Sequence, residues 1–198
     1  MAMSWPKCTV VVLIVHFVTV AAHAVDVSVH TRRQSSVIVV EATADFTGRM
    51  EQAWNVLTDY DHLAQFIPNM KSSRIIERGS SGPLIEQKGV ARLLLFDFPL
   101  EVKLVVTEFP PYRILSRGAG GSFKTFRGEY NLSIVEGRTR LRYVCEMVPD
   151  FFFPPILGTA MLRHNVEESF SALADEIVRR SATPSAVPRT STGAAHAR

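Results

Sequence analysis

Cysteine is scarce in this chain, whose 198 residues include only two, Cys8 and Cys145. Two isolated thiols cannot supply a cysteine-rich zinc site, and the scattered histidines show no metal-ligand spacing. The chain also lacks a phosphate-binding glycine loop, a dinucleotide-binding fingerprint and a G-x-S-x-G motif. We therefore expect no metal and no cofactor, and a fold stabilised by an apolar core rather than by crosslinks.

A strong excess of charge of either sign is also missing. The chain has 22 basic and 19 acidic residues, which gives a net charge of +3. Its arginines occur in separate pairs, such as Arg32-Arg33 and Arg179-Arg180, rather than in one basic run. Nucleic-acid-binding domains concentrate lysine and arginine on one face, so we expect no nucleic-acid partner.

Long apolar runs are limited to one, at the N-terminus. Lys7 precedes an apolar stretch over residues 9–22, and Ala22-His23-Ala24 follows with a small-x-small pattern. This is the layout of a secretory signal peptide, and the stretch is shorter than the ~20 apolar residues that a membrane-spanning helix needs. We predict a signal peptide over residues 1–24, cleavage after Ala24, and export to a periplasm or to the medium. The alternative is an uncleaved membrane anchor.

Hydrophobic periodicity divides the remaining chain into strands and helices. Residues 25–35 show no clear period and are interpreted as a leader, and residues 181–198 as a disordered tail. Gly118-Ala119-Gly120-Gly121 is interpreted as a turn, as is Glu136-Gly137. The predicted strands cover residues 36–44, 71–78, 84–95, 97–109, 112–117, 123–135 and 138–148, and the predicted helices cover 49–57, a short segment after Thr58, and 156–180. Segregated strands and helices favour an α+β domain over residues 36–180, with about seven antiparallel strands curling around the last helix.

The alternation along the strands predicts which side chains face the concave side of the sheet. This inward set is apolar, apart from two tyrosine hydroxyls and one thiol. A curved sheet that holds one helix leaves space between them unless large side chains fill it, and such concave apolar places favour ligands. The residues expected to line this space are Leu100, Val102, Leu104, Phe126, Tyr130, Leu141, Tyr143, Cys145, Met147, Phe152 and Met161.

The segment over residues 53–70, AWNVLTDYDHLAQFIPNM, resembles the opening of the START-like (SRPBCC) superfamily. The most similar branch is the polyketide cyclase/dehydrase and coenzyme Q-binding group, and the similarity extends over roughly residues 36–180. The resemblance implies a helix-grip fold with a deep apolar cavity between the sheet and the last helix. Members of the superfamily bind lipids, sterols, quinones or polyketides, and a minority are cyclases or dehydratases. The predicted signal peptide departs from most of this branch.

Two functions from different classes fit these observations. The first is a binding or carrier protein for a hydrophobic small molecule, such as a lipid, an isoprenoid or quinone, or a polyketide-like compound. The second is a cyclase or dehydratase in which Tyr130 and Tyr143 polarise a carbonyl and His164 acts as the acid–base group. The alternatives are ordinary core tyrosines and, for the histidine, a surface pair with Glu168.

Three consecutive phenylalanines, Phe151, Phe152 and Phe153, lie in a proline-rich loop before the last helix. They can cover the cavity as a lid, touch a membrane or a hydrophobic partner, or pack across the end of the sheet. A third, partner-binding role predicts a cavity filled by side chains. The expected partner is a hydrophobic small molecule, with transient membrane contact through the three phenylalanines as a further expectation.

Overall fold

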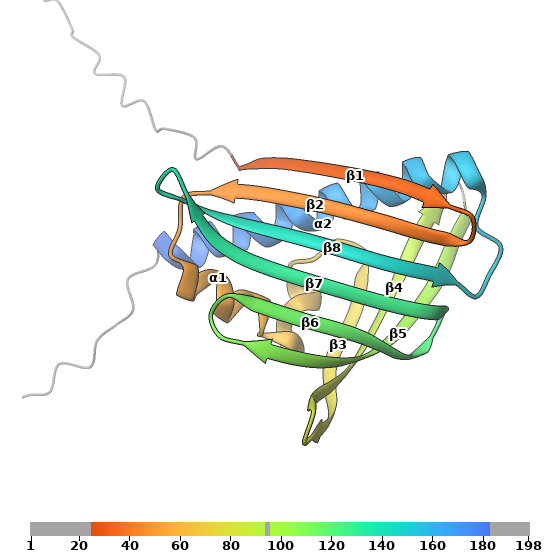
Figure 1. Cartoon of the computed structure of the whole chain (residues 1–198), viewed down its shortest axis with the longest axis horizontal. Coiled ribbons are helices and arrows are strands. Elements are labelled where there is room, and N and C mark those ends of the chain that lie inside the picture. The colour runs from red at the N-terminus through yellow and green to blue at the C-terminus, as the bar shows by residue number, and fades with distance from the viewer. Residues whose placement is uncertain (1–24, 94–95, 183–198) are drawn as a thin grey trace, which may run out of the picture.

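Eight antiparallel strands and one long helix account for most of the structure (Figure 1). The computed structural model describes residues 25–93 and 96–182, so the predicted signal peptide and residues 183–198 of the predicted tail lie outside the described residues. Within these ranges, no helix combines the length and the apolar character needed to cross a bilayer. The elements are β1 (Asp26–Gln34), β2 (Val37–Phe46), α1 (Met50–Leu57), the 3₁₀ helix η1 (Tyr60–Gln65), β3 (Met70–Gly79), β4 (Gly82–Leu93), β5 (Phe96–Phe109), β6 (Arg113–Gly121), β7 (Phe123–Val135), β8 (Arg138–Pro149) and α2 (Pro155–Ala182).

The eight strands form a single sheet in the order β1-β2-β8-β7-β6-β5-β4-β3, with antiparallel pairing throughout. The sheet is open, and β1 and β3 are its two edges. Figure 1 shows α2 running along one face of the sheet behind β1, β2 and β8, and α2 also packs against α1. This arrangement confirms the predicted α+β, helix-grip fold.

The prediction of about seven strands is one too low, because residues 25–35 do not form a leader without regular structure. Most of this segment is β1, which pairs along its whole length with β2. Half-buried Val27, Val29 and Thr31 alternate with exposed neighbours, as expected for a strand at the edge of a sheet. The apolar half of the pattern is short and is interrupted by charged residues, so local periodicity alone did not indicate a strand.

The glycine-rich segment after Arg117 was predicted to be a turn, and this prediction is wrong because the segment continues β6. Gly120 and Gly121 pair with Lys103 and Val102 of β5, and the chain turns only afterwards, at Ser122. A Cβ atom on Gly121 would lie 2.2 Å from the backbone oxygen of Glu101, and its φ of +103° also disfavours other residues. Glycine is needed here because two strands approach closely. The predicted Glu136-Gly137 turn is confirmed, with a positive φ at both residues.

An ionic cluster connects the end of α2 to the segment that carries the superfamily motif. Arg180 Nη1 donates to Asp59 Oδ2 at 2.8 Å, and its guanidinium lies 5.6 Å from the centre of the Phe66 ring. Glu176 accepts hydrogen bonds from Arg179 and from Arg180. Asp59 and Phe66 flank η1, so this cluster fixes η1 against the last helix.

The buried core occupies only part of the space between the sheet and α2. Phe170, Leu173 and Ile177, on the C-terminal half of the helix, pack into the main cluster of buried residues together with Phe46 and Leu141. The N-terminal half of α2 does not enter that main cluster through buried side chains. The space beneath that half is where the candidate site lies.

Candidate ligand-binding site

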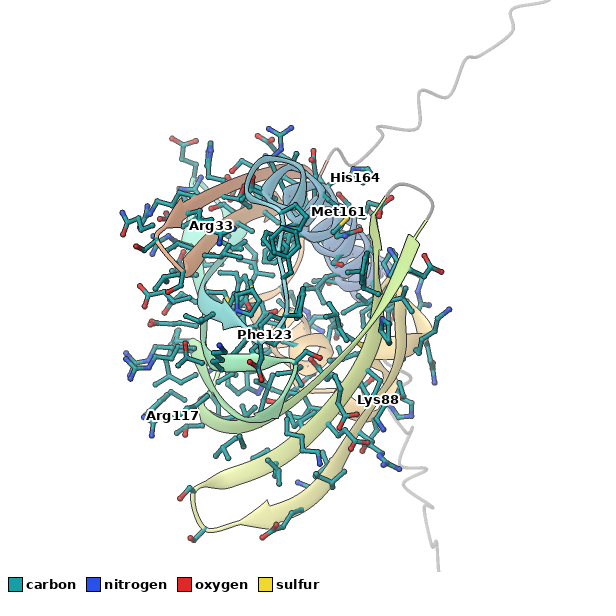
Figure 2. All side chains as sticks on the ribbon, turned by 90° about the vertical axis from the view of Figure 1, so that its right-hand side faces the viewer. Arg33, Lys88, Arg117, Phe123, Met161 and His164 are labelled. Carbon is teal, nitrogen blue, oxygen red and sulfur yellow. The ribbon has the colours of Figure 1, made fainter. Side chains whose placement is uncertain are left out.

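A cavity of about 680 Å³ lies beneath the N-terminal half of α2, bounded by β4, β5 and the loop that follows β8. Ligand pockets for drug-sized molecules typically measure about 300–1,000 Å³. Figure 2 views this end of the molecule, with Met161 on α2 and Phe123 at the start of β7. Among the apolar lining residues that the sequence did not indicate are Ile67, Val90, Phe98, Phe123 and Leu162.

The residues predicted to line the binding space divide into three groups. Leu100, Val102, Met147, Phe152 and Met161 line the large cavity. Leu104, Phe126, Tyr130 and Tyr143 line a second, smaller cavity of about 100 Å³. Leu141 and Cys145 line neither cavity and are packed into the core.

Leu162 lies at helical spacing with Val166 and Phe170, which is typical of one inward-facing stripe of the last helix. In the structure it faces the large cavity, whereas Phe170 is buried in the core. A stripe in the sequence indicates the inward face of a helix and does not indicate where that face meets an open space.

The smaller cavity lies deeper in the molecule and has a polar edge made of tyrosines. The rings of Tyr130 and Tyr143 stack with their centres 4.3 Å apart. Tyr60, from η1, also lines this space, and its hydroxyl donates to Glu108 Oε1 at 2.8 Å. Burial raises the pKa of Tyr130 and Tyr143, and burial together with the Glu108 carboxylate raises that of Tyr60, so all three stay neutral.

Cys145 has the surroundings of a core residue rather than of a nucleophile. Its side chain is buried, and burial raises the pKa of the thiol to about 12. The neighbouring side chain is the neutral Tyr143. A thiol reacts through its thiolate, so a group with such a pKa stays protonated and inert near neutral pH.

His164 lies apart from the tyrosines that were predicted to act with it. Its side chain is 69% exposed, and Nε2 lies 3.4 Å from Glu168 Oε1 in a surface pair. It lines neither cavity, whereas Tyr130 and Tyr143 both line the smaller one. The predicted cyclase mechanism requires the three groups to converge on one point, and they do not. In the described ranges, no group of three histidine, cysteine or acidic residues is placed to hold a metal ion.

The phenylalanine loop forms one side of the large cavity and is unevenly exposed. Phe152 is 85% exposed and Phe151 is 38% exposed. Phe153 is half-buried, and its carbonyl oxygen accepts a hydrogen bond from Arg33 Nη1 at 2.9 Å. Phe98, across the cavity on β5, is also exposed. Apolar side chains therefore reach the solvent at the rim of the cavity.

Charged groups accompany this rim and are paired with one another. Lys88 and Glu101 both line the large cavity, and Lys88 Nζ lies 3.4 Å from Glu101 Oε2. Asp150 lines the large cavity as well, and its Oδ1 lies 3.5 Å from Lys124 Nζ. These side chains are exposed or half-exposed, so they belong to the outer part of the cavity. Exposed pairs of this kind contribute little to stability.

The fold and the cavity agree with the relationships of the chain to known proteins. A family profile described as "Polyketide cyclase / dehydrase and lipid transport" matches residues 48–171, which is more than half of the chain. No curated protein matches the chain.

Three solved structures illustrate the fold. A START superfamily protein from Mycobacterium smegmatis is 15% identical, with a TM-score of 0.59 and coverage of 72% of this chain and 98% of that one. The Zhui aromatase/cyclase from Streptomyces sp. R1128 is 17% identical, with a TM-score of 0.56 and coverage of 73% and 93%. A STAR-related lipid transfer protein fragment from Xanthomonas axonopodis is 11% identical, with a TM-score of 0.54 and coverage of 77% and 98%. The profile match, which includes most of the residues that line the two cavities, places the chain in the polyketide cyclase/dehydrase and lipid transport family, and the three solved structures share its fold.

Proposed function

We propose that the protein is an exported binding or carrier protein that holds a hydrophobic small molecule in the large cavity. The observation that carries this proposal is an apolar space of about 680 Å³ between the sheet and α2, of the size that ligands occupy. A lipid, an isoprenoid or quinone, or a polyketide-like compound fits such a lining. The family includes lipid transport by its description, which supports a carrier role.

Exposed phenylalanines at the rim give the carrier a route for loading. Phe151 and Phe152 expose apolar surface to solvent next to the cavity. Exposed apolar patches of this kind commonly mark sites that contact a membrane, a ligand or another protein. Transient contact of this loop with a membrane would let an apolar ligand pass without crossing water. A Phe152→Ser variant is expected to slow the transfer of a fluorescent lipid from vesicles several-fold, by more than it weakens the binding of that lipid at equilibrium.

Ligand binding is tested with a matched pair of variants on α2. Asn165 is half-buried and lines the large cavity, whereas Arg163, two residues earlier, is exposed. Asn165→Trp is expected to fill part of the cavity and to weaken the binding of an apolar fluorescent probe at least 10-fold, whereas Arg163→Trp leaves it unchanged. Equal affinity in both variants, with both folded, would contradict the location of the site.

Identifying the ligand requires protein that has been purified with its bound molecule still in place. Native mass spectrometry of the protein expressed with residues 1–24, followed by organic extraction, is expected to recover an apolar molecule. An empty protein that also binds no apolar probe would reject the carrier role and favour a partner-binding role.

Export is tested in the same preparation through the mass of the purified protein. Cleavage after Ala24 predicts a chain that begins at Val25 and is found in the periplasm or the medium. A chain that keeps residues 1–24 and sediments with membranes would instead support the uncleaved anchor.

A cyclase or dehydratase acting in the same cavity is the second candidate, favoured by the family description and by the similarity to an aromatase/cyclase. Such an enzyme would have to use cavity groups other than the exposed His164. Incubation with a poly-β-ketone mimic separates the two roles. An enzyme releases a product that has cyclised or lost water, whereas a carrier releases the compound with its mass and chromatographic retention unchanged.

A further inference from the structure

The two cavities share part of their walls. Ile67, which follows η1, and Gln87, on β4, line both of them. Gln87 Nε2 donates a long side-chain hydrogen bond to Ser73 Oγ, at 3.3 Å. One aliphatic and one amide side chain are therefore common to the walls of both cavities.

The smaller cavity holds a hydroxyl group that the rest of the protein does not satisfy. Within the described residues, the Tyr130 hydroxyl makes no hydrogen bond to another protein group. It is also not one of the fully buried side-chain oxygens without a partner, so a ligand atom can reach it. The Tyr60 hydroxyl donates to Glu108, which leaves its oxygen free to accept. Tyr60 and Tyr130 both line this cavity. The space thus offers at least one donor and one acceptor.

We infer that the smaller cavity is the inner end of the ligand site, where Tyr130 and Tyr60 bind an uncharged oxygen group, such as a hydroxyl, ketone or phenol, of an otherwise apolar ligand. The apolar body of that ligand then lies in the large cavity and points toward the rim. This inference rests on the proposed carrier function and specifies the ligand class and its orientation.

The distribution of charge decides which kind of polar group can enter. Among the described residues, no lysine or arginine lines the smaller cavity, and the Glu108 carboxylate accepts the hydrogen bond of the Tyr60 hydroxyl at its edge. A carboxylate or phosphate group placed there would be desolvated without a cation to compensate it, which is costly. The charged lining residues, Lys88, Glu101 and Asp150, belong to the large cavity. Anionic amphiphiles therefore cannot bind with the charged end inward.

The size of the smaller cavity also suits a polar end group. A single water needs only about 10–15 Å³ of such space, so about 100 Å³ can accept a hydroxylated ring or a ketone with a few neighbouring carbons. Leu104, Val106 and Ile114 supply apolar walls around the tyrosine edge. An apolar ring with one oxygen therefore matches both the walls and the edge.

The test compares two probes that differ by one hydroxyl, 4-octylphenol and octylbenzene. Their dissociation constants are measured on the full chain by displacement of a fluorescent apolar dye. Tyr130→Phe removes the hydroxyl and keeps the ring, and Tyr112→Phe, at an exposed tyrosine that lines neither cavity, is the matched control. Because a neutral hydrogen bond contributes about 0.5–1.5 kcal/mol, Tyr130→Phe is expected to weaken octylphenol binding about 3- to 10-fold and to leave octylbenzene unchanged.

The outcomes separate this inference from the function on which it rests. If both probes bind the wild-type protein and Tyr130→Phe changes neither, the inner polar site is wrong while the carrier role stands. If neither probe binds, the carrier role itself fails. Should Tyr130→Phe not fold, ring-labelled tyrosine provides a second measurement, since the chain has only four tyrosines. Octylphenol is then expected to shift the Tyr130 ring signals more than octylbenzene, and equal shifts would overturn the inference.

Discussion

Replacing Glu176 by glutamine should destabilise the protein in a way that depends on pH. Hydrogen bonds from Arg179 and then Arg180 lower the pKa of Glu176 from 4.5 to about 2. At 1.36 kcal/mol per pH unit, this difference corresponds to a ceiling of about 3.4 kcal/mol. The side chains of Arg179 and Arg180 are 66% and 25% exposed, so solvent screening reduces the expected contribution to about 1–2 kcal/mol.

The sign of the pH dependence follows from the lowered pKa. Because the folded state holds the Glu176 carboxylate better than the unfolded state does, its contribution is complete above pH 4.5 and disappears as the pH falls toward 2. Urea unfolding of the wild type and of Glu176→Gln should therefore differ by about 1–2 kcal/mol at pH 7 and by clearly less at pH 2.5. Glu167→Gln, at an exposed position of the same helix, is the control and should show no such trend. A difference that stays the same at both pH values would refute an ionic origin.

Three further predictions concern the core and the close approach of strands. Phe46→Ala removes a fully buried ring and should lower the free energy of unfolding by about 3–5 kcal/mol, measured by urea titration. Gly121→Ala should lower the melting temperature clearly more than Gly79→Ala, because an added Cβ meets backbone oxygen at 2.2 Å in the first case and at 3.6 Å in the second; equal melting temperatures would contradict the strand pairing. In a Cys8→Ser variant, the buried Cys145 thiol should react with a disulfide reagent only after unfolding, whereas rapid reaction of the native protein would contradict its burial.

The sequence predicted most of the fold because most elements carry their own periodicity. Strands with one buried face and a helix with one buried stripe can be recognised without their neighbours. β1 failed this test because exposed Asp26, Ser28 and Arg32 dominate a strand that is only half-buried on its other face. Its existence depends on pairing with β2, which is not visible in a short window of sequence. The same reason explains the error at residues 118–121, where Gly121 reflects the close approach of β5 rather than a turn.

The candidate site was less predictable than the fold, for a related reason. Leu141, Cys145 and Met147 alternate on the same face of β8, yet only Met147 lines the large cavity. Alternation along a strand indicates which side chains point inward, but it does not indicate what lies opposite them. Phe170 and Leu173 of α2 fill the space near one end of the sheet, and the cavity remains only where the helix presents Met161 and Asn165.

Two features of the site face the solvent or the cavity rather than the core. Phe152 exposes most of its ring at the rim, and the Tyr130 hydroxyl lies in the interior without a hydrogen bond from the described residues. Neither is needed for the core, which is complete around Phe46 and Phe170 without them. A ligand with an oxygen at one end and an apolar body satisfies the inner hydroxyl and fills the space next to the rim. Binding of such a ligand should therefore raise the melting temperature, and it should do so less in Tyr130→Phe than in the wild type, because the variant cannot donate a hydrogen bond to the ligand oxygen and binds it more weakly.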